Sequence, residues 1–219
     1  MKQGMSLRVL MAGVALAASA LLAGCASAPP RAERFVAAPA GTAYAFHRRS
    51  TGSFGTMDGT VDWTLENREW QGKPVMAQVS PQAGTVMHEL SSGSFGYVAT
   101  LNPRGQTSFT FEPPVGYRYP LELGKSWSSS HKMTLHPSGQ VLTWDLSYKI
   151  EDYESLTVPA GTFKVWRIAI TDNFGQVDRY WIDPDAGIPV IKRTQMRPAS
   201  HPQGAGTLEG ELISLRRPK

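Results

Sequence analysis

Cysteine is nearly absent from this sequence, and clustered charge and long apolar runs are missing as well. Cys25 is the only cysteine in 219 residues, which excludes a disulfide framework. The apolar run at residues 9–22 is shorter than the roughly 20 residues that a membrane-spanning helix needs. Charged residues make up 18% of the chain, and the basic ones are scattered. No nucleic-acid partner is therefore expected, because such a partner requires a basic stripe.

The spacings typical of metal, cofactor and nucleophile sites are also missing. The five histidines form no H-E-x-x-H pattern, and no Gly-x-Ser-x-Gly elbow or dinucleotide-binding loop occurs. Asp183 and Asp185 lie two apart in a turn, with Asp178 upstream, and oxygen ligands at alternating positions can hold Ca²⁺, but aspartate before proline commonly caps its own turn. We therefore expect no catalytic residue, no metal and no cofactor, and a protein that is not an enzyme.

The first 24 residues have the three parts of a secretory signal peptide. Lys2 and Arg8 supply a positive start without any acidic residue, and residues 9–22 form a short apolar core. Small residues follow this core and close the segment. This order predicts export and removal of residues 1–24.

The residues just before Cys25 resemble the lipobox of bacterial lipoproteins. Leu22, Ala23 and Gly24 precede the cysteine in the order that this motif has. The resemblance implies cleavage before Cys25 and attachment of diacylglycerol to its thiol, so that a lipid anchor joins the protein to a membrane. Because Ala26 and not aspartate follows the cysteine, the resemblance implies the outer membrane, facing the periplasm, rather than the inner membrane.

The remainder of the chain divides by composition into three parts. Removing the signal leaves 195 residues, and the formal net charge falls from +4 to +2 because the signal carries two basic and no acidic residues. Residues 25–41 are rich in Ala and Pro and predict a lipidated, extended tether that buries little. Residues 42–215 have the length of one domain. Residues 216–219 form a basic tail, most simply interpreted as a solvated end.

Short β-type runs separated by turn residues fill the domain. Most runs are five to nine residues long, which predicts an antiparallel sandwich or barrel. The candidate strands are 42–49, 60–67, 74–80, 85–90, 95–101, 107–111, 128–135, 141–154, 163–171, 176–183, 188–196 and 207–215. In residues 141–150 apolar and polar side chains alternate strictly, so this strand is expected to have one apolar and one wet face.

Three motifs in the second half resemble a widespread group of uncharacterised, β-rich bacterial envelope lipoproteins. Residues 123–127 read LGKSW, residues 158–165 read VPAGTFKV and residues 180–190 read YWIDPDAGIPV, and they resemble the motifs LGKxW, VPAGTFKV and YWxxPxxGxPV of that group. The motif residues are Trp127, Pro159, Gly161, Phe163, Trp181, Pro184 and Gly187. The resemblance implies an all-β fold, a single antiparallel and strongly curved sheet or partly open barrel of about ten to twelve strands. It brings no catalytic residues, and each motif residue also has a structural use in a turn or in the core.

Aromatic residues are numerous, with six Trp, seven Tyr and eight Phe. A curved sheet with an aromatic concave side could hold a lipid or another apolar ligand, which resembles, at the level of the fold, the lipoprotein localisation factors. A binding or assembly module is therefore the first hypothesis. If the aromatic residues instead fill the core, the alternative is a structural accessory lipoprotein that binds another envelope protein. An envelope hydrolase, whose carboxylates meet only in the fold, is a third.

Overall fold

The computed structural model describes residues 30–91 and 94–219. Cys25 and the lipobox residues Leu22, Ala23 and Gly24 lie outside the described residues, as does the rest of the signal segment. The described residues form fourteen strands and no helix. Accordingly, this part of the chain holds no helix long and apolar enough to cross a bilayer.

Twelve strands form one closed ring, and two short strands pair only with each other. In hydrogen-bonded order the ring is β10 (Val141–Val158), β11 (Gly161–Asp172), β12 (Val177–Ile182), β13 (Lys192–Arg197), β14 (Gly206–Arg216), β2 (Ala43–Gly52), β3 (Met57–Trp70), β4 (Lys73–Ser80), β5 (Gly84–Ser91), β6 (Ser94–Leu101), β7 (Thr107–Gly116) and β9 (Ser126–Leu135). The separate pair is β1 (Arg31–Ala32) with β8 (Leu121–Glu122).

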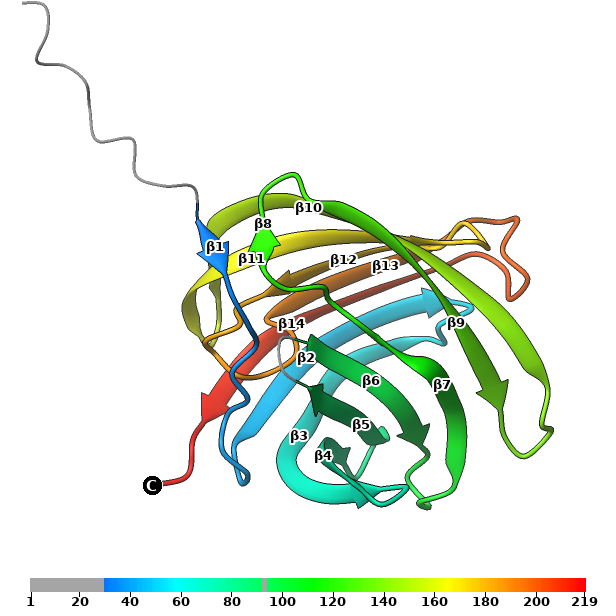
Figure 1. Cartoon of the computed structure of the whole chain (residues 1–219), viewed down its shortest axis with the longest axis horizontal. Helices are drawn as coiled ribbons and strands as arrows, with labels where there is room; N and C mark the ends of the chain where they lie inside the picture. The colour runs from blue at the N-terminus through cyan, green and yellow to red at the C-terminus, as the bar shows by residue number, and fades with distance from the viewer. Residues whose placement is uncertain (1–29, 92–93) are drawn as a thin grey trace, which may run out of the picture.

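Every neighbouring pair in the ring is antiparallel, and the ring closes where β10 pairs with β9 as well as with β11 (Figure 1). The predicted all-β class, the strongly curved antiparallel sheet and the number of strands are confirmed. The structure adds that the sheet closes on itself, so the barrel has no free edge strand. A sandwich of two separate sheets is excluded.

Alternation along β10 decides which side chains enter the barrel. Leu146, Tyr148 and Ile150 are buried, whereas Ser147 and Lys149 between them are exposed. Successive side chains of a strand point to opposite faces, so the apolar set packs inside and the polar set faces water. This is the one-sided strand that the sequence predicts.

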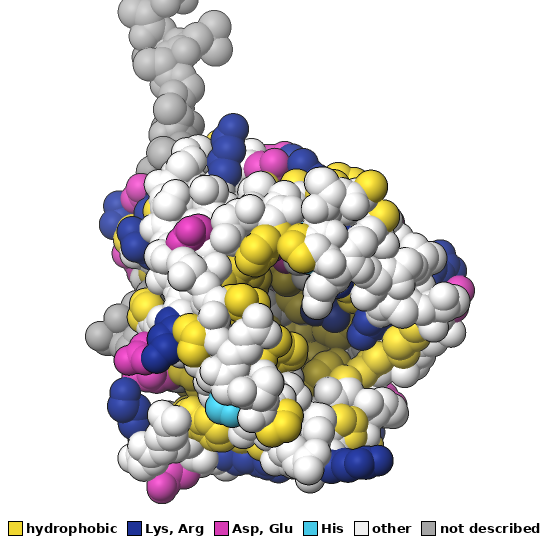
Figure 2. Space-filling view, turned by 90° about the vertical axis from the view of Figure 1, so that its right-hand side faces the viewer, with side chains coloured by type: hydrophobic (Ala, Val, Ile, Leu, Met, Phe, Trp, Pro, Cys, Tyr) yellow, Lys and Arg dark blue, Asp and Glu magenta, His cyan; other side chains and the backbone are white. Residues whose placement is uncertain are grey.

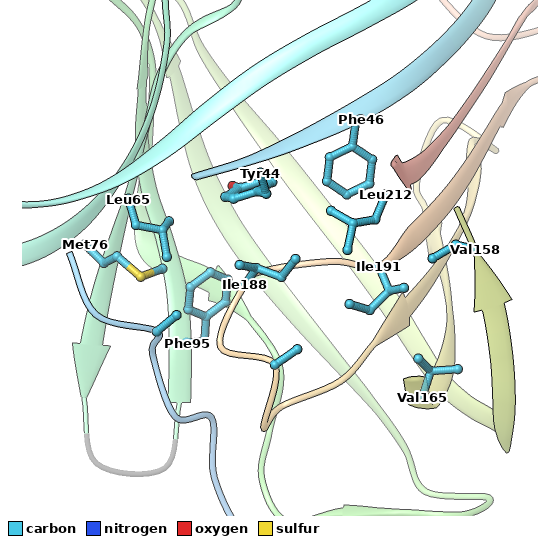
Figure 3. Close-up of a cluster of buried hydrophobic side chains, with 12 residues drawn as sticks. Tyr44, Phe46, Leu65, Met76, Phe95, Val158, Val165, Ile188, Ile191 and Leu212 are labelled. Carbon is cyan, nitrogen blue, oxygen red and sulfur yellow. The ribbon is translucent and has the colours of Figure 1, made fainter. Parts of the chain in front are cut away.

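The loop at residues 183–191 closes one end of the barrel. The sequence predicts a strand over 188–196, but β13 begins only at Lys192, and the residues before it turn into the barrel instead. Ile188 and Ile191 are fully buried there. Their neighbours in this core cluster include Tyr44, Phe46, Leu65, Met76, Phe95, Val158, Val165 and Leu212 (Figure 3). We call residues 183–191 the plug.

The segment that leads into the barrel lies against the plug. The amide of Val36 donates to the carbonyl of Pro184 (3.2 Å), and the amide of Ala38 donates to the carbonyl of Gly187 (2.9 Å). Figure 1 shows this segment, after β1, running along the same end of the barrel as the chain's C-terminus. Most of residues 30–41 are exposed, but Ala38 is buried, so the described part of the predicted tether is held against the barrel.

The physical reason is the apolar content of this segment. Phe35, Ala37 and Ala38 pack on the core cluster around the plug. Composition alone does not distinguish these residues from the rest of the Ala/Pro-rich stretch. The basic tail also differs from a free end, because Arg217 donates from Nη2 to the carbonyl of Ala186 (2.9 Å). Both ends of the described chain thus contact the plug.

Candidate ligand-binding cavity

A cavity of about 450 Å³ lies inside the barrel. Pro189 and Val190 of the plug contribute to its lining, so the plug closes the inner end. Figure 2 views the opposite end of the barrel and shows it hollowed, with hydrophobic side chains within the hollow and basic side chains at one side. The aromatic lining residues are Tyr44, Phe46, Trp63, Phe95, Tyr97, Phe109, Tyr117, Trp144, Tyr148 and Tyr180.

A continuous series of aromatic contacts, which we call the aromatic wall, contributes His88, Phe95, Tyr97 and Trp144 to the cavity lining. His88 stacks on Phe95 with ring centroids 4.2 Å apart, and its ring lies 5.9 Å from that of Tyr97. Tyr97 continues to Phe111 (4.5 Å) and Phe111 to Trp144 (5.6 Å). These rings come from β5, β6, β7 and β10. Such surfaces suit flat or chain-like apolar ligands.

A chain of polar groups begins beside the aromatic wall. Tyr44 donates from its hydroxyl to Oε1 of Gln78 (2.5 Å), which leaves the Gln78 amide nitrogen free to donate to Nε2 of His88. His88 must therefore accept at Nε2 and carry its proton at Nδ1. Nδ1 is buried and has no partner among the described residues.

Burial controls the charge of His88. The side chain is 4% exposed, and burial lowers its pKa from 6.5 to about 3 because the charged imidazolium loses hydration. The hydrogen bond from Gln78 acts in the same direction, since a protonated Nε2 could not accept it. His88 is thus neutral at ordinary pH and belongs to the aromatic wall rather than to a proton-transfer site.

Two arginines line a different part of the cavity, on β2 and β13. Arg48 pairs across the sheet with Gly210, and Gly210 pairs with Arg193. Because β14 carries a glycine at this level, no side chain of β14 lies between the two arginines. A Cβ built on Gly210 would lie 3.5 Å from Cγ and Nε of Arg193, so the Arg193 side chain lies directly over that glycine. We call Arg48 and Arg193 the arginine pair.

Arg48 is poorly satisfied within the protein. It donates from Nη2 to the carbonyl of Phe54 at 3.3 Å, but its Nε is buried without a partner among the described residues. Burial, followed by the positive charge of Arg193, lowers the pKa of Arg48. Phe54 belongs to the turn between β2 and β3, so the Arg48 guanidinium reaches toward the end of the barrel opposite the plug.

Asp178 is the carboxylate in the cavity lining, and its hydrogen bonds are made to amides and a phenol. Gln176 donates to Oδ1 (2.9 Å), and Gln195 donates to Oδ2 (3.0 Å), which Tyr180 also contacts from its hydroxyl (3.4 Å). Burial raises the pKa of Asp178, and the hydrogen bonds from Gln195 and Gln176 oppose the rise. Asp178 lines the cavity, whereas Asp183 lies in the plug, so these two calcium candidates from the sequence do not share a site.

No group of three or more His, Cys, Asp or Glu side chains in residues 30–91 and 94–219 is arranged to hold a metal ion. Asp183 instead accepts, through Oδ1, the backbone amides of Asp185 (3.0 Å) and Ala186 (3.3 Å). This is the local turn capping that aspartate before proline favours.

The motif residues gather mainly at the closed end of the barrel. Pro159 lies in the turn between β10 and β11, and Gly161 is the first residue of β11. The amide of Ala160 between them donates to the carbonyl of Leu212 on β14 (3.3 Å). Phe163 packs on the same core cluster.

Pro184 and Gly187 belong to the plug and accept hydrogen bonds from the N-terminal segment, as described above. Trp127 is buried and stacks on Tyr148 with centroids 4.7 Å apart. Trp181 lies on the outer side of β12, where it donates from Nε1 to Oε1 of Glu154 (2.9 Å), and Lys192 lies over its ring. None of the seven motif residues is among the cavity-lining residues.

No motif in the sequence marks the arginine pair or His88 as site residues. One signal was available for Arg48, since Tyr44, Phe46 and Arg48 occupy alternate positions of one strand. On a strand whose apolar residues face the core, an arginine of the same parity points inward, and an inward charge requires a reason. No comparable signal marks Arg193, because the pattern around β13 is not alternating.

Comparison with known proteins defines the fold. No protein family and no curated protein matches the sequence. Among solved structures, a Bacteroides fragilis protein described as exported and as having a YmcC-like fold aligns over 84% of this chain and all of its own, with a TM-score of 0.53 and 13% identity. The chain therefore shares that fold.

Two further structures are described as lipoproteins. One is from Parabacteroides distasonis (TM-score 0.48, 14% identity, 84% of this chain and 99% of that chain). The other is the hypothetical lipoprotein YmcC of Escherichia coli (TM-score 0.43, 14% identity, 83% of this chain and 86% of that chain). The relationship to envelope lipoproteins that the three motifs suggest stays a prediction at the level of sequence.

Proposed function

We propose that this protein is a membrane-anchored envelope lipoprotein whose barrel binds a lipid or another apolar ligand. The observation that carries the proposal is the cavity of about 450 Å³ with its aromatic lining, which falls within the range of about 300–1,000 Å³ typical of small-molecule sites. The proposed role is binding, and no catalytic step is assigned to it.

The lining supports this role better than a role in packing alone. Trp63, Tyr97 and Trp144 remain only partly buried although they point into the barrel. Large aromatic side chains that face an open interior keep apolar surface in contact with water, and a ligand that covers this surface would gain roughly 25 cal/mol per Å². The cavity therefore offers a driving force for an apolar occupant.

The anchor proposal rests on the sequence. A positive start, an apolar core and the order Leu22, Ala23, Gly24, Cys25 support lipid attachment at the cysteine, and Ala26 supports the outer membrane facing the periplasm. The chain shares the fold of the exported B. fragilis protein, which is compatible with an envelope location. In this proposal the short stretch between Cys25 and residue 30 joins the lipid to the barrel.

A direct test of the ligand uses the full-length protein purified from membranes in detergent. Organic extracts are analysed by mass spectrometry, and lipid is quantified per mole of protein. Val86 lines the cavity and is only partly buried, so Val86→Trp should fill part of the cavity and lower the amount of bound lipid severalfold. Val141→Trp adds the same side chain at a position that is 51% exposed and serves as the control.

The outcome that rejects ligand binding is equal lipid in the wild type, Val86→Trp and Val141→Trp, because that amount would represent detergent-carried background. Crosslinking to one envelope protein in place of a bound lipid would favour the structural accessory role.

The anchor is tested separately by Cys25→Ser. This variant should not incorporate radiolabelled fatty acid and should accumulate as the uncut precursor. If the Cys25→Ser protein is still labelled and matured, lipid attachment and cleavage do not depend on Cys25.

A further inference from the structure

We infer that the cavity ligand is an anionic amphiphile, with an apolar chain along the aromatic wall and a carboxylate or phosphate head held by Arg48 and Arg193. This inference rests on the proposed function and adds the chemical class of the ligand. It follows from the positions of the arginines in the ring of strands and from their lack of partners within the protein.

The arginine pair faces the aromatic wall across the barrel. In the ring of twelve strands, β14, which lies between the two arginines, and β7, which carries Phe111, are six positions apart in both directions. In a closed ring this separation places them on opposite sides. The basic lining residues are thus confined to the side of β2 and β13, which Tyr44, Phe46 and Tyr180 also line, and the aromatic wall lies opposite. An amphiphile can place its head at the arginines and its chain along the aromatic wall.

The spacing of the arginines suits one oxyanion. Their strands are separated only by β14, so at about 4.8 Å per strand the two backbones lie roughly 10 Å apart. Gly210 contributes no side chain between them, and the Arg193 side chain lies over it toward Arg48. Two guanidinium groups that converge from this separation can both donate to the oxygens of one carboxylate or phosphate, the groups whose geometry the guanidinium fork matches.

The protein does not neutralise both arginines. Among the residues that the structure describes, neither Arg48 nor Arg193 forms an ion pair. Asp178 is engaged by Gln176, Gln195 and Tyr180 and balances at most one of the two charges. Charges withdrawn from water are normally paired. Arg48 and Arg193 are both partly buried, so their lack of an ion pair points to a partner outside the chain.

The test measures the head-group preference of the full-length protein reconstituted into phosphatidylcholine vesicles. The probes share one brominated acyl chain and carry a carboxylic acid, a lysophosphatidic acid head or an alcohol. Bromine quenches tryptophan fluorescence on contact, and Trp63 and Trp144 line the cavity, so a probe inside the barrel is detected whereas a probe in the bilayer leaves these side chains unquenched. We expect one or both anionic probes to half-saturate at a concentration about tenfold or more below that of the alcohol.

Matched variants assign the preference to the arginine pair. Arg48→Gln with Arg193→Gln should abolish the preference for the anion. Arg49→Gln with Lys192→Gln removes the same number of charges from the neighbouring positions of the same strands, whose side chains lie on the other face, and should leave the preference unchanged. Arg48→Lys with Arg193→Lys keeps the charge without the fork and should retain part of the preference.

The possible outcomes separate this inference from the proposed function. A carboxylate preference identifies fatty-acid chemistry, and a phosphate preference identifies a lipid headgroup. Equal quenching by acids and alcohol overturns the anionic head but leaves an apolar ligand. No quenching by any probe overturns both. If the double Gln variant does not fold, the wild type measured at high salt tests the same charges. The preference for the anion should then be lost while alcohol binding stays unchanged. A preference that does not depend on salt would refute the assignment of the head group to the arginine pair.

Discussion

Protonation of His88 should make the barrel less stable at low pH, and His88→Gln should remove this effect. The pKa is about 6.5 for the unfolded chain and about 3 in the folded barrel, so between these values the unfolded state binds more protons. Stability is therefore fully present above pH 6.5 and falls as the pH decreases toward 3. The full difference corresponds to about 5 kcal/mol at 1.36 kcal/mol per pKa unit.

At pH 5 the expected loss is about 2 kcal/mol, because the unfolded histidine is then almost fully protonated and the folded one is not. The assay is denaturant unfolding of the purified protein at pH 7.5 and pH 5, followed by tryptophan fluorescence. His88→Gln keeps an acceptor for the Gln78 amide and cannot be protonated. The pH-dependent loss in the wild type should therefore exceed that in His88→Gln by about 2 kcal/mol.

His136 provides the control, because it is exposed and His136→Gln should keep the pH dependence of the wild type. Only the difference between proteins is interpreted, since Asp178, whose pKa is raised, contributes with the opposite sign in both. Parallel losses in the wild type and in His88→Gln would refute the placement of a neutral His88 within the aromatic wall.

Three further predictions concern the plug and the cavity. Gly187→Ala should lower the free energy of unfolding by about 3 kcal/mol and expose residues 30–41 to protease. The reason is that Gly187 has φ +73° and that a Cβ there would lie 2.4 Å from the Ala38 amide nitrogen. The control Gly105→Ala, also at positive φ but in open space, should cost only about 1 kcal/mol. Ile191→Ala removes a fully buried side chain and should cost about 2–5 kcal/mol in denaturant unfolding, whereas Met196→Ala, 53% exposed, should change stability by less than about 0.5 kcal/mol. Asp178→Asn should strengthen quenching by the brominated anions a few-fold and leave the alcohol unchanged, because it removes the negative charge in the cavity lining; weaker anion binding would contradict a cationic head-group site.

Much of the fold could be predicted because strands leave a local signature. Alternation in β10 and the turn residues between runs identified all twelve barrel strands approximately, since side-chain direction follows from sequence position within a strand. The errors occurred where side chains from distant parts of the chain decide the outcome. Residues 188–191 are β-prone locally, yet they fold into the barrel end because Phe46 and Leu212 provide an apolar surface there.

The N-terminal segment shows the same limit. Its Ala and Pro content indicates an extended chain, and it is extended, but Phe35 and Ala38 have a partner only because the plug lies beside them. Composition reports how a segment behaves alone, whereas burial depends on what the folded chain places opposite it.

The sequence by itself determined three things: the signal-like segment before the single cysteine, the β-strand content, and the lack of a local metal or nucleophile motif. Each of these is a property of neighbouring residues. Only the tertiary structure decided that the sheet closes, that its aromatic residues leave a cavity, and that Arg48 and Arg193 meet across Gly210. Ring closure and cross-strand registry join residues more than a hundred positions apart, such as Arg48 and Gly210. No local pattern encodes such a pairing, and the proposed binding site depends on it.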